Sequence, residues 1–287
     1  MATGSGAQDS TASAGRKAAV ARARSAYETA RAEHHEKLAG EADTEALREA
    51  HLRIAEIHRS TAACHQTAAR LQESYAARLT TWSRDRDRPR PLFMAGVAEA
   101  CGTSSAALTL VGSTLDQLAL AASDEPSRAA QELEFLLGEG PARDATREVR
   151  LVAASGLTLR DRWPGYGPAV GELGIAEVAA IPLTLSGACV GALAVFDPAP
   201  DFVDSATFSE VAEAITRSMI LSTDGAPGLC DDFDMRALVH QAAGMVSVQL
   251  DCSVSDALEM IKAHAFAEGV SAQSVADRIV RGLLCLD

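Results

Sequence analysis

A long segment without helix-breaking residues dominates the first third of this 287-residue chain. Residues 16–84 are rich in alanine, glutamate and arginine, contain a single glycine, Gly40, and have no proline. These residue types favour helix by intrinsic propensity, whereas glycine and proline disfavour it. Residues 40–44 carry the only turn signal, and Asp43 or Thr44 can cap the helix that follows. We therefore expect a helical hairpin whose second helix is about 60 Å long.

Apolar side chains recur along the second helix with the 3-4 spacing that is typical of a coiled-coil seam. The positions are Leu47, Ala50, Ile54, Ile57, Thr61, Cys64, Ala68, Leu71 and Tyr75, and the first helix offers Val20, Ala23, Tyr27, Ala30, His34 and Leu38. A hairpin this thin has little core of its own and must pack against another surface. We expect the same hairpin of a second subunit to provide that surface, so the sequence predicts a homodimer.

Three histidines, His51, His58 and His65, recur every seven residues beside this predicted seam. Side chains seven residues apart lie about 10.5 Å apart along a helix axis, which is too far to share one metal ion. We interpret the three histidines as a polar flank of the coiled coil rather than as a metal or pH-sensing site.

Composition limits the class of protein further. Residues 1–15 are mostly Ala, Ser, Gly and Thr, which predicts a disordered tail and shows no secretion signal. No apolar run is long enough to cross a bilayer, so we expect a cytoplasmic protein without a membrane partner. The six cysteines show neither a C-x-x-C pair nor zinc-site spacing, which predicts reduced, buried thiols.

The net charge of −13 is distributed unevenly along the chain. Residues 1–88 carry a net charge of +2, residues 89–230 carry −10 and residues 231–287 carry −5. A nucleic-acid-binding protein gains much of its affinity from clustered Lys and Arg side chains that neutralise phosphates. The acidic C-terminal segment therefore lacks a strong basic surface.

After Pro89 and Pro91 the helical composition ends and strand-like runs begin. The expected elements are a helix over residues 93–101, strands over 106–111 and 117–122, a helix over 129–137, a strand over 149–154, a strand pair over 176–185 and 188–196, and a helix over 202–221. Ser186 and Gly187 separate the strand pair by two residues, which is typical of a tight β-hairpin. The order of elements predicts an α+β fold with an antiparallel sheet covered by helices.

Residues 89–223 resemble a GAF domain of the type that precedes ANTAR modules in actinobacterial proteins. The matching segments are residues 135–145, 162–164, 174–175, 181–183 and 191–193. The resemblance implies a sensor of a small molecule or a protein signal, with the ligand held between the sheet and its covering helices. The cyclic-nucleotide motif of some GAF domains is missing, and no cysteine suits haem or bilin attachment. We therefore expect no cofactor.

Glu139, Trp163 and Tyr166 are the candidate ligand-binding residues of this sensor. Two glycines flank Glu139, which permits close backbone approach to a ligand, and the two aromatic rings can form pocket walls. Two alternatives stay open. Residues 138–141 can be a loop that needs positive φ, and Trp163 can be a lid that packs over the core.

Residues 233–287 predict a three-helix bundle, joined to the sensor by a Gly-, Pro- and Asp-rich linker over residues 224–232 that can act as a hinge. Apolar positions at helical spacing are Leu238, Ala242, Met245, Val246 and Leu250, then Ala257, Leu258, Ile261, Ala265 and Phe266, then Val275, Ile279, Val280, Leu283 and Leu284. Ser255 can cap the second helix, Gly269 can end it, and Ser271 can cap the third.

The bundle resembles the ANTAR domain, the RNA-binding module of bacterial transcription antiterminators, through residues 241–246, 255–258 and 275–280. The resemblance implies a homodimer that grips paired RNA stem-loops. Candidate RNA contacts are Arg236, His240, Gln241, Lys262, His264, Arg278 and Arg281. Ala243 stands where the family usually has lysine. The alternative is therefore a bundle that has lost RNA binding and serves as a protein-interaction or dimerisation module.

Catalytic motifs are missing from the sequence. It contains no phosphate-binding loop, dinucleotide fingerprint, nucleophile elbow or metalloprotease helix. We therefore expect a protein that is not an enzyme and holds no metal. The sequence predicts a signal-responsive transcription antitermination regulator, with the degenerate bundle as the alternative.

Overall fold

The computed structural model describes residues 3–85, 89–203, 205–220 and 233–286. The chain forms two compact units, one of Met1–Ala100 with Asp204–Asp231 and one of Cys101–Val203 with Asp232–Asp287. The segment expected as one sheet domain, residues 89–223, is thus divided between the two units, and the bundle expected over residues 233–287 shares a unit with the sheet. The expected linker over residues 224–232 lies outside the described residues. Within the described ranges, no helix has the length and apolarity needed to cross a membrane.

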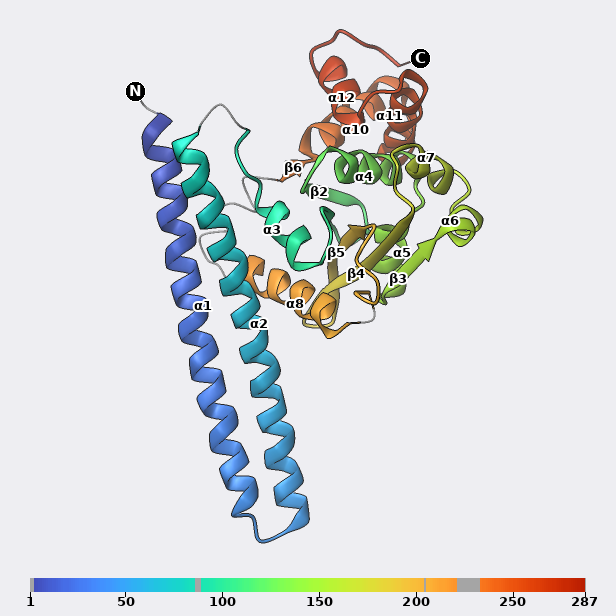
Figure 1. The fold of residues 1–287 in the computed structure, drawn as a ribbon. Helices are drawn as coiled ribbons and strands as arrows, with labels where there is room; N and C mark the ends of the chain where they lie inside the picture. The colour runs from blue at the N-terminus through green and yellow to red at the C-terminus, as the bar shows by residue number, and fades with distance from the viewer. Residues whose placement is uncertain (1–2, 86–88, 204, 221–232, 287) are drawn as a thin grey trace. The chain divides into compact units, whose positions relative to one another are not determined.

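The first unit contains the expected hairpin, formed by α1 (Thr3–Gly40) and α2 (Glu45–Arg84) (Figure 1). Thr44 caps α2, because its hydroxyl accepts a hydrogen bond from Leu47 N at 3.3 Å. Helix α1 already begins at Thr3, so the segment expected as a disordered tail is helical. Ala14 is buried, which indicates that packing against α2 extends the helix where composition alone did not predict it.

The seam between α1 and α2 consists of small and polar side chains, not of the large apolar stripe that the sequence predicted. The buried seam residues are Ala14, Ala18, Ser25, Ala32 and Ala39 on α1 and Ala55, Ala62, Ala69 and Gln72 on α2. Small side chains let two helix axes approach closely. The expected seam residue Ile57 is 65% exposed instead, and Tyr27 is 60% exposed.

The hairpin has an outer apolar face, which we define as Val20, Tyr27, Ile54 and Ile57, all exposed. Ile54 precedes the seam residue Ala55, and Tyr27 and Ile57 precede Glu28 and His58, which contact each other across the two helices. Two antiparallel helices are related by a two-fold axis perpendicular to their common plane, so equivalent positions lie on the same side of the pair. Glu28 Oε2 lies 2.5 Å from His58 Nδ1, which places the residues before them, Tyr27 and Ile57, at the same level.

Two further helices of the first unit, α3 (Phe93–Ala100) and α8 (Ala206–Ile220), pack against α2. In this part of α2 the predicted apolar stripe is covered, since Cys64, Leu71 and Tyr75 are buried. The Tyr75 ring meets the Phe93 ring edge-on, with centroids 5.6 Å apart. One stripe on α2 is thus covered along one half and exposed along the other.

The second unit contains a six-stranded antiparallel sheet in the order β3-β4-β5-β1-β2-β6. The strands are β1 (Ser105–Val111), β2 (Gln117–Ala122), β3 (Val152–Ser155), β4 (Glu177–Leu185), β5 (Ala188–Phe196) and β6 (Asp234–Met235). Ser186 and Gly187 join β4 to β5 with φ of 49° and 85°, as a two-residue hairpin turn requires. The α+β fold with an antiparallel sheet is therefore confirmed.

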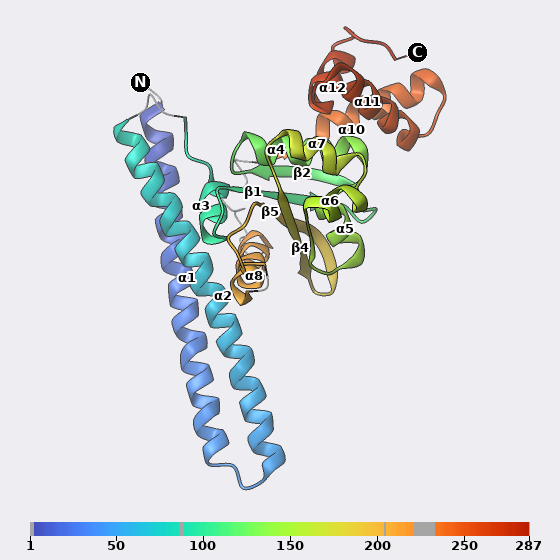
Figure 2. The same cartoon turned by 45° about the vertical axis from the view of Figure 1, so that its right-hand side comes forward.

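Four helices cover one face of this sheet: α4 (Glu125–Leu137), α5 (Pro141–Glu148), α6 (Gly156–Arg162) and α7 (Tyr166–Glu172) (Figure 2). Of these, the sequence predicted only α4. A capping box of Asp124 and Ser127 starts α4, and Gly138 with φ of 70° ends it. The other three have at most eight residues, too short to show a helical period in the sequence.

The C-terminal bundle consists of α10 (Ala237–Leu250), α11 (Val254–Glu268) and α12 (Ala272–Val280). Its core includes Val246, Ile261 and Ile279, none more than 2% exposed. The expected third-helix residue Leu283 is 72% exposed because α12 ends at Val280.

The ends of these helices confirm two of the three predicted signals. Gly269 ends α11 with φ of 65°, and Ser271 caps α12 by accepting from Ser274 N at 3.2 Å. The expected cap Ser255 is wrong, since Ser253 starts α11 by accepting from Asp256 N at 3.0 Å.

Candidate functional site

A buried arginine holds the C-terminal bundle on the sheet. Arg236 donates its backbone N–H to Leu118 O at 2.9 Å, next to the pairing of β6 with β2. Its side chain is fully buried, with Nη2 2.5 Å from Glu132 Oε2 and Nε donating to Gln117 Oε1 at 3.1 Å. The other carboxylate oxygen of Glu132 accepts from Ala272 N at 2.8 Å. A buried guanidinium needs such a partner, so Glu132 ties α10 and α12 to α4.

Phe135 of α4 belongs to the apolar core of the bundle. Arg236 Cζ lies 4.4 Å and Lys262 Nζ 4.7 Å from the centroid of its ring. Lys262 is 6% exposed, and its ammonium lies 2.8 Å from Glu259 Oε1. Cations are attracted to the face of an aromatic ring, more strongly when they are desolvated. We call Glu132, Phe135, Arg236 and Lys262 the clasp.

A chain of hydrogen bonds runs from the clasp along the sheet-facing side of α4. Gln117 Nε2 donates to Thr109 Oγ1 at 3.4 Å, and the Thr109 hydroxyl donates to Gln131 Oε1 at 2.5 Å. Gln131 Nε2 then donates to Glu134 Oε2 at 2.9 Å, and Arg143 N donates to Glu134 Oε1 at 2.5 Å. The network connects the clasp with the first turn of α5.

Glu134 is a buried carboxyl group in this network. Burial raises its pKa to about 8, against the opposing hydrogen bonds from Arg143 N and the Gln131 amide. Gly140 makes room for it, because a Cβ at that position would lie 2.6 Å from Glu134 Cδ. Tyr166 is also buried, and its hydroxyl has no hydrogen-bond partner among the described residues. Burial and the neighbouring Glu134 raise the pKa of Tyr166.

A cavity of about 40 Å³ lies beside the network. Residues of β1, α4, α5 and α11 line it, among them Thr109, Gln131, Glu134, Arg143, Leu258 and Lys262. One water needs roughly 10–15 Å³ measured in this way, so the cavity accepts a few water-sized groups or one small polar ligand. Helix α4 contributes to both the cavity and the clasp. Gln131 and Glu134 line the cavity, while Glu132 and Phe135 hold the bundle.

The predicted ligand-binding residues Glu139, Trp163 and Tyr166 do not line this cavity. Glu139 Oε1 accepts hydrogen bonds from the N–H groups of Gly165 at 2.5 Å and Tyr166 at 2.8 Å, at the start of α7. Trp163 is 2% exposed and packs edge-on against Tyr166, with ring centroids 6.0 Å apart. All three side chains therefore hold α7 against the core, in agreement with the alternative in which Trp163 packs there.

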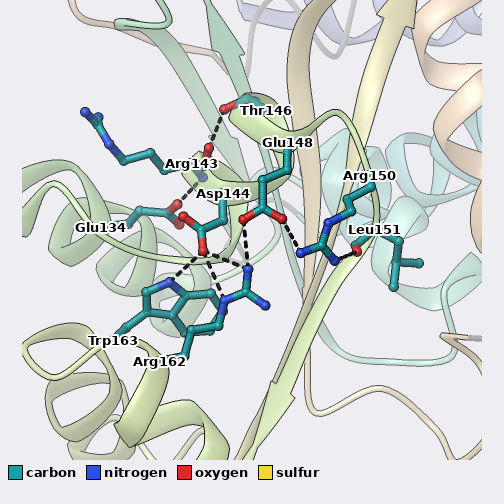
Figure 3. Close-up of polar contacts among 9 residues, drawn as sticks. All are labelled: Glu134, Arg143, Asp144, Thr146, Glu148, Arg150, Leu151, Arg162 and Trp163. Carbon is teal, nitrogen blue, oxygen red and sulfur yellow. Dashed lines mark hydrogen bonds and ion pairs between the residues drawn. The ribbon is translucent and has the colours of Figure 1, made fainter.

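Figure 3 shows how Trp163 is fixed. Its indole N–H donates to Asp144 Oδ2 at 3.1 Å, and Arg162 Nη2 lies 2.9 Å from the same oxygen. Arg162 also reaches Glu148, which pairs with Arg150. The matched segment around residues 162–164 is thus anchored by an ion-pair network on α5.

Two of the predicted RNA contacts are not accessible. Arg236 and Lys262 are buried in the clasp, so neither cation faces solvent in this conformation. His240 is half-buried, with Nε2 3.4 Å from Gln117 O. Gln241 is exposed on the surface of α10.

The remaining predicted RNA contacts pair with acidic side chains. Arg278 forms an ion pair with Glu268, whose Oε1 also lies 3.0 Å from His264 Nε2. Arg281 Nε lies 2.9 Å from Asp277 Oδ1. A phosphate would have to compete with these carboxylates for each cation.

The sequence reading did not identify Glu132, Phe135, Gln131 or Glu134 as site residues. A usable signal was present, since Gln131 and Glu134 lie one turn apart on the face of α4 that also buries Ala130. Polar side chains on the buried face of an amphipathic helix need partners and so indicate a polar network.

None of the cysteines that the structure describes belongs to the clasp or lines the cavity. Burial raises the pKa of Cys64 and of Cys101 to about 12, as expected of buried thiols. Cys285 is exposed, contrary to that expectation. Within the ranges that the structure describes, no group of three or more His, Cys, Asp or Glu side chains is placed to hold a metal ion.

Comparison of the sequence with models of known protein families and with curated proteins finds no match. The likeness to GAF and ANTAR domains therefore rests on the residue motifs alone. The fold defines an α+β sheet unit with a three-helix bundle attached to it, together with a separate helical unit.

Proposed function

We propose that this chain is a signal-responsive regulator of transcription antitermination that acts in the cytoplasm as a homodimer. The GAF-like sheet is the sensor, and the ANTAR-like bundle is the output module that binds RNA stem-loops. The clasp is the observation that carries the proposal. It joins the bundle to α4, the helix that also lines the cavity, so one element connects signal and output.

The clasp supports a specific route from signal to RNA. A ligand in the cavity contacts Gln131 and Glu134 and displaces α4. Since Glu132 and Phe135 lie on the same helix, that displacement weakens their hold on Arg236. Two of the four Lys and Arg side chains of residues 233–286 then become available to phosphates. A protein with two more phosphate contacts binds RNA more tightly, with a salt dependence steeper by roughly 1.5 in log–log slope.

The outer apolar face supports the homodimer. Exposed Tyr27 and Ile57 lie at the same level of the hairpin, and the stripe to which Ile57 belongs is covered farther along α2. A second hairpin placed on this face completes a four-helix bundle, in which such stripes meet in one core.

Titration of a labelled RNA with two stem-loops at several salt concentrations tests the proposal. The wild type is compared with Phe135→Ala, which removes the ring that both Arg236 and Lys262 contact. Phe266→Ala is the matched control, because Phe266 is 54% exposed on α11. We expect tighter binding and a steeper salt dependence for Phe135→Ala alone. If no form binds this RNA better than an unrelated hairpin RNA, the antitermination proposal is wrong.

A second candidate function is supported by the charges of the bundle. Residues 231–287 carry a net charge of −5, and Arg278 and Arg281 are paired with acidic side chains. These features favour a bundle that binds a protein partner instead of RNA. If the Phe135→Ala variant, in which the clasp is opened, binds no RNA at any salt concentration, this candidate is favoured.

A further inference from the structure

Histidine side chains meet in the seam of the hairpin, near its tip. His35 of α1 lies between His51 and His58 of α2, with ring centroids 5.3 Å and 5.6 Å away. The sequence spacing had placed His51 and His58 too far apart to share one metal ion. The opposite helix supplies the missing neighbour, because His35 reaches both rings across the seam.

The contact between His35 and His51 restricts their protonation. Their Nδ1 atoms lie 3.1 Å apart, so one must carry a proton and donate while the other must be bare and accept. Two protonated rings at this distance have no hydrogen bond and repel each other. His58 differs, because its Nδ1 lies 2.5 Å from an acidic partner, Glu28 Oε2.

The other charged groups near His35 add to the cost of protonating it. Arg31 and His34 lie on its own helix, and His51 and His58 face it from α2. Burial, followed by the effects of His51, Arg31, His34 and His58, lowers the pKa of His35. Farther along the seam, burial lowers the pKa of His65. Arg24 and Arg217 of α8 lower this pKa further, and Glu28 raises it. Glu28 is thus an acidic side chain that lies near both His58 and His65.

We propose that His35, His51 and His58 form a proton-operated release in the hairpin seam, which holds the tip closed when the His35–His51 pair is neutral and opens it on acidification. Protonation of both partners breaks their hydrogen bond and places like charges between two helices whose buried seam consists mainly of alanines. Opening separates α1 from α2 at the level of Tyr27 and Ile57 and so disrupts the outer apolar face. The release is a property of the helical unit and does not depend on RNA binding.

The direction of the pH effect follows from the lowered pKa. Between the folded pKa of His35 and the ordinary histidine value near 6.5, the opened hairpin binds more protons than the closed one. Stability of the tip is therefore fully present above about pH 6.5 and is lost as the pH falls below it.

Hydrogen exchange of backbone amides in residues 28–58 of the full-length protein tests the release. After correction for intrinsic exchange, we expect opening to increase at least about tenfold from pH 7.5 to pH 5. His51→Gln removes the titrating partner and should abolish most of that increase. His34→Gln is the matched control on an exposed neighbouring position and should retain it. Unchanged opening in the wild type, or an undiminished increase in His51→Gln, overturns the proposal.

A measurement on the wild type covers the case in which His51→Gln does not fold. NMR titration of isotope-labelled histidines should show His35 titrating below the ordinary histidine value. Ordinary titration of His35 contradicts the release. Protection of the tip that requires added Zn²⁺ and disappears with a chelator also contradicts it, in favour of a metal site.

Discussion

The hairpin and the C-terminal bundle use helical patterns in opposite ways. In the bundle, the aliphatic side chains that mark each helix face inward, and Ile261 is fully buried. In the hairpin, the aliphatic side chains face outward, and Ile57 is 65% exposed while alanines fill the seam. Three helices can surround a branched side chain, whereas two helices leave one side of any stripe open. A 3-4 spacing therefore predicts a stripe but not the neighbour that covers it.

The largest loss of stability is expected in the clasp, which holds the bundle and has no counterpart in the hairpin. Glu132→Ala leaves the Arg236 guanidinium buried without its charged partner, which costs roughly 3–5 kcal/mol. We expect a lower melting temperature for the sheet unit and faster hydrogen exchange in α10 and α12, with α1 unchanged. Glu45→Ala, which removes an exposed ion pair with Arg48, is the control and should cost less than about 1 kcal/mol. Equal losses in the two variants would contradict a buried clasp.

The next effect compares the same substitution in the two regions. Ile261→Ala removes a buried side chain and should destabilise the sheet unit by about 2–5 kcal/mol. Ile57→Ala removes an exposed side chain and should change the stability of a single hairpin by less than roughly 0.5 kcal/mol. Denaturant unfolding at low protein concentration, followed by hydrogen exchange in each unit, measures both. A large loss for Ile57→Ala at low concentration would show that the outer face is covered within one chain.

A third prediction concerns pH and sharpens the contrast between the units. Glu134 has a pKa raised to about 8, above the value near 4.5 of an unfolded chain. Its contribution to stability is therefore present below about pH 4.5 and is lost as the pH rises toward 8. Glu134→Gln removes the titrating group but leaves one oxygen to accept the hydrogen bonds of Arg143 N and the Gln131 amide. The stability of the variant should therefore fall less than that of the wild type as the pH rises from about 4.5 to about 8. Thermal melts across this range measure the difference, and parallel pH profiles for both proteins would refute it. The hairpin should respond in the opposite direction, since its histidines destabilise it in acid.

The substitution expected to change folding least, Ile57→Glu, is expected to change association most. Ile57→Glu places a charge on the outer apolar face and should convert the proposed dimer to monomer in sedimentation experiments. Leu52→Glu is a matched control, because Leu52 is 46% exposed but does not belong to the outer apolar face. Both variants should retain the helix content of the wild type. Dissociation by Leu52→Glu, or a wild type that is already monomeric, would remove the argument for this face.

Sequence patterns predicted those elements that local chemistry determines. Thr44, Gly269 and Ser271 each end or cap a helix where expected, and the turn at Ser186 and Gly187 has the predicted geometry. Ser255 was the wrong cap because Ser253, two residues earlier, offers the same hydroxyl. Short helices such as α6 and α7 were missed, since seven residues carry too little periodicity.

The candidate site was less predictable, because its parts come from distant segments. Glu132 and Arg236 are separated by 104 positions, and no local pattern relates them. Arg236 was predicted as an RNA contact, which requires an exposed side chain. Only the pairing of β6 with β2 brings it under the bundle. Trp163 and Tyr166 were selected for their chemistry as pocket walls, whereas the structure uses them as core.

The repetitive seam of the hairpin also affects how its register is chosen. On α2 the seam repeats histidine and alanine every seven residues, so a slip of one heptad would place α1 against nearly identical side chains. Side-chain packing alone therefore discriminates weakly between the two alignments. The four residues between α1 and α2 are too few to absorb such a slip, so the connection and not the interface selects the alignment. Lengthening this loop by seven residues is expected to yield a mixture of two hairpins.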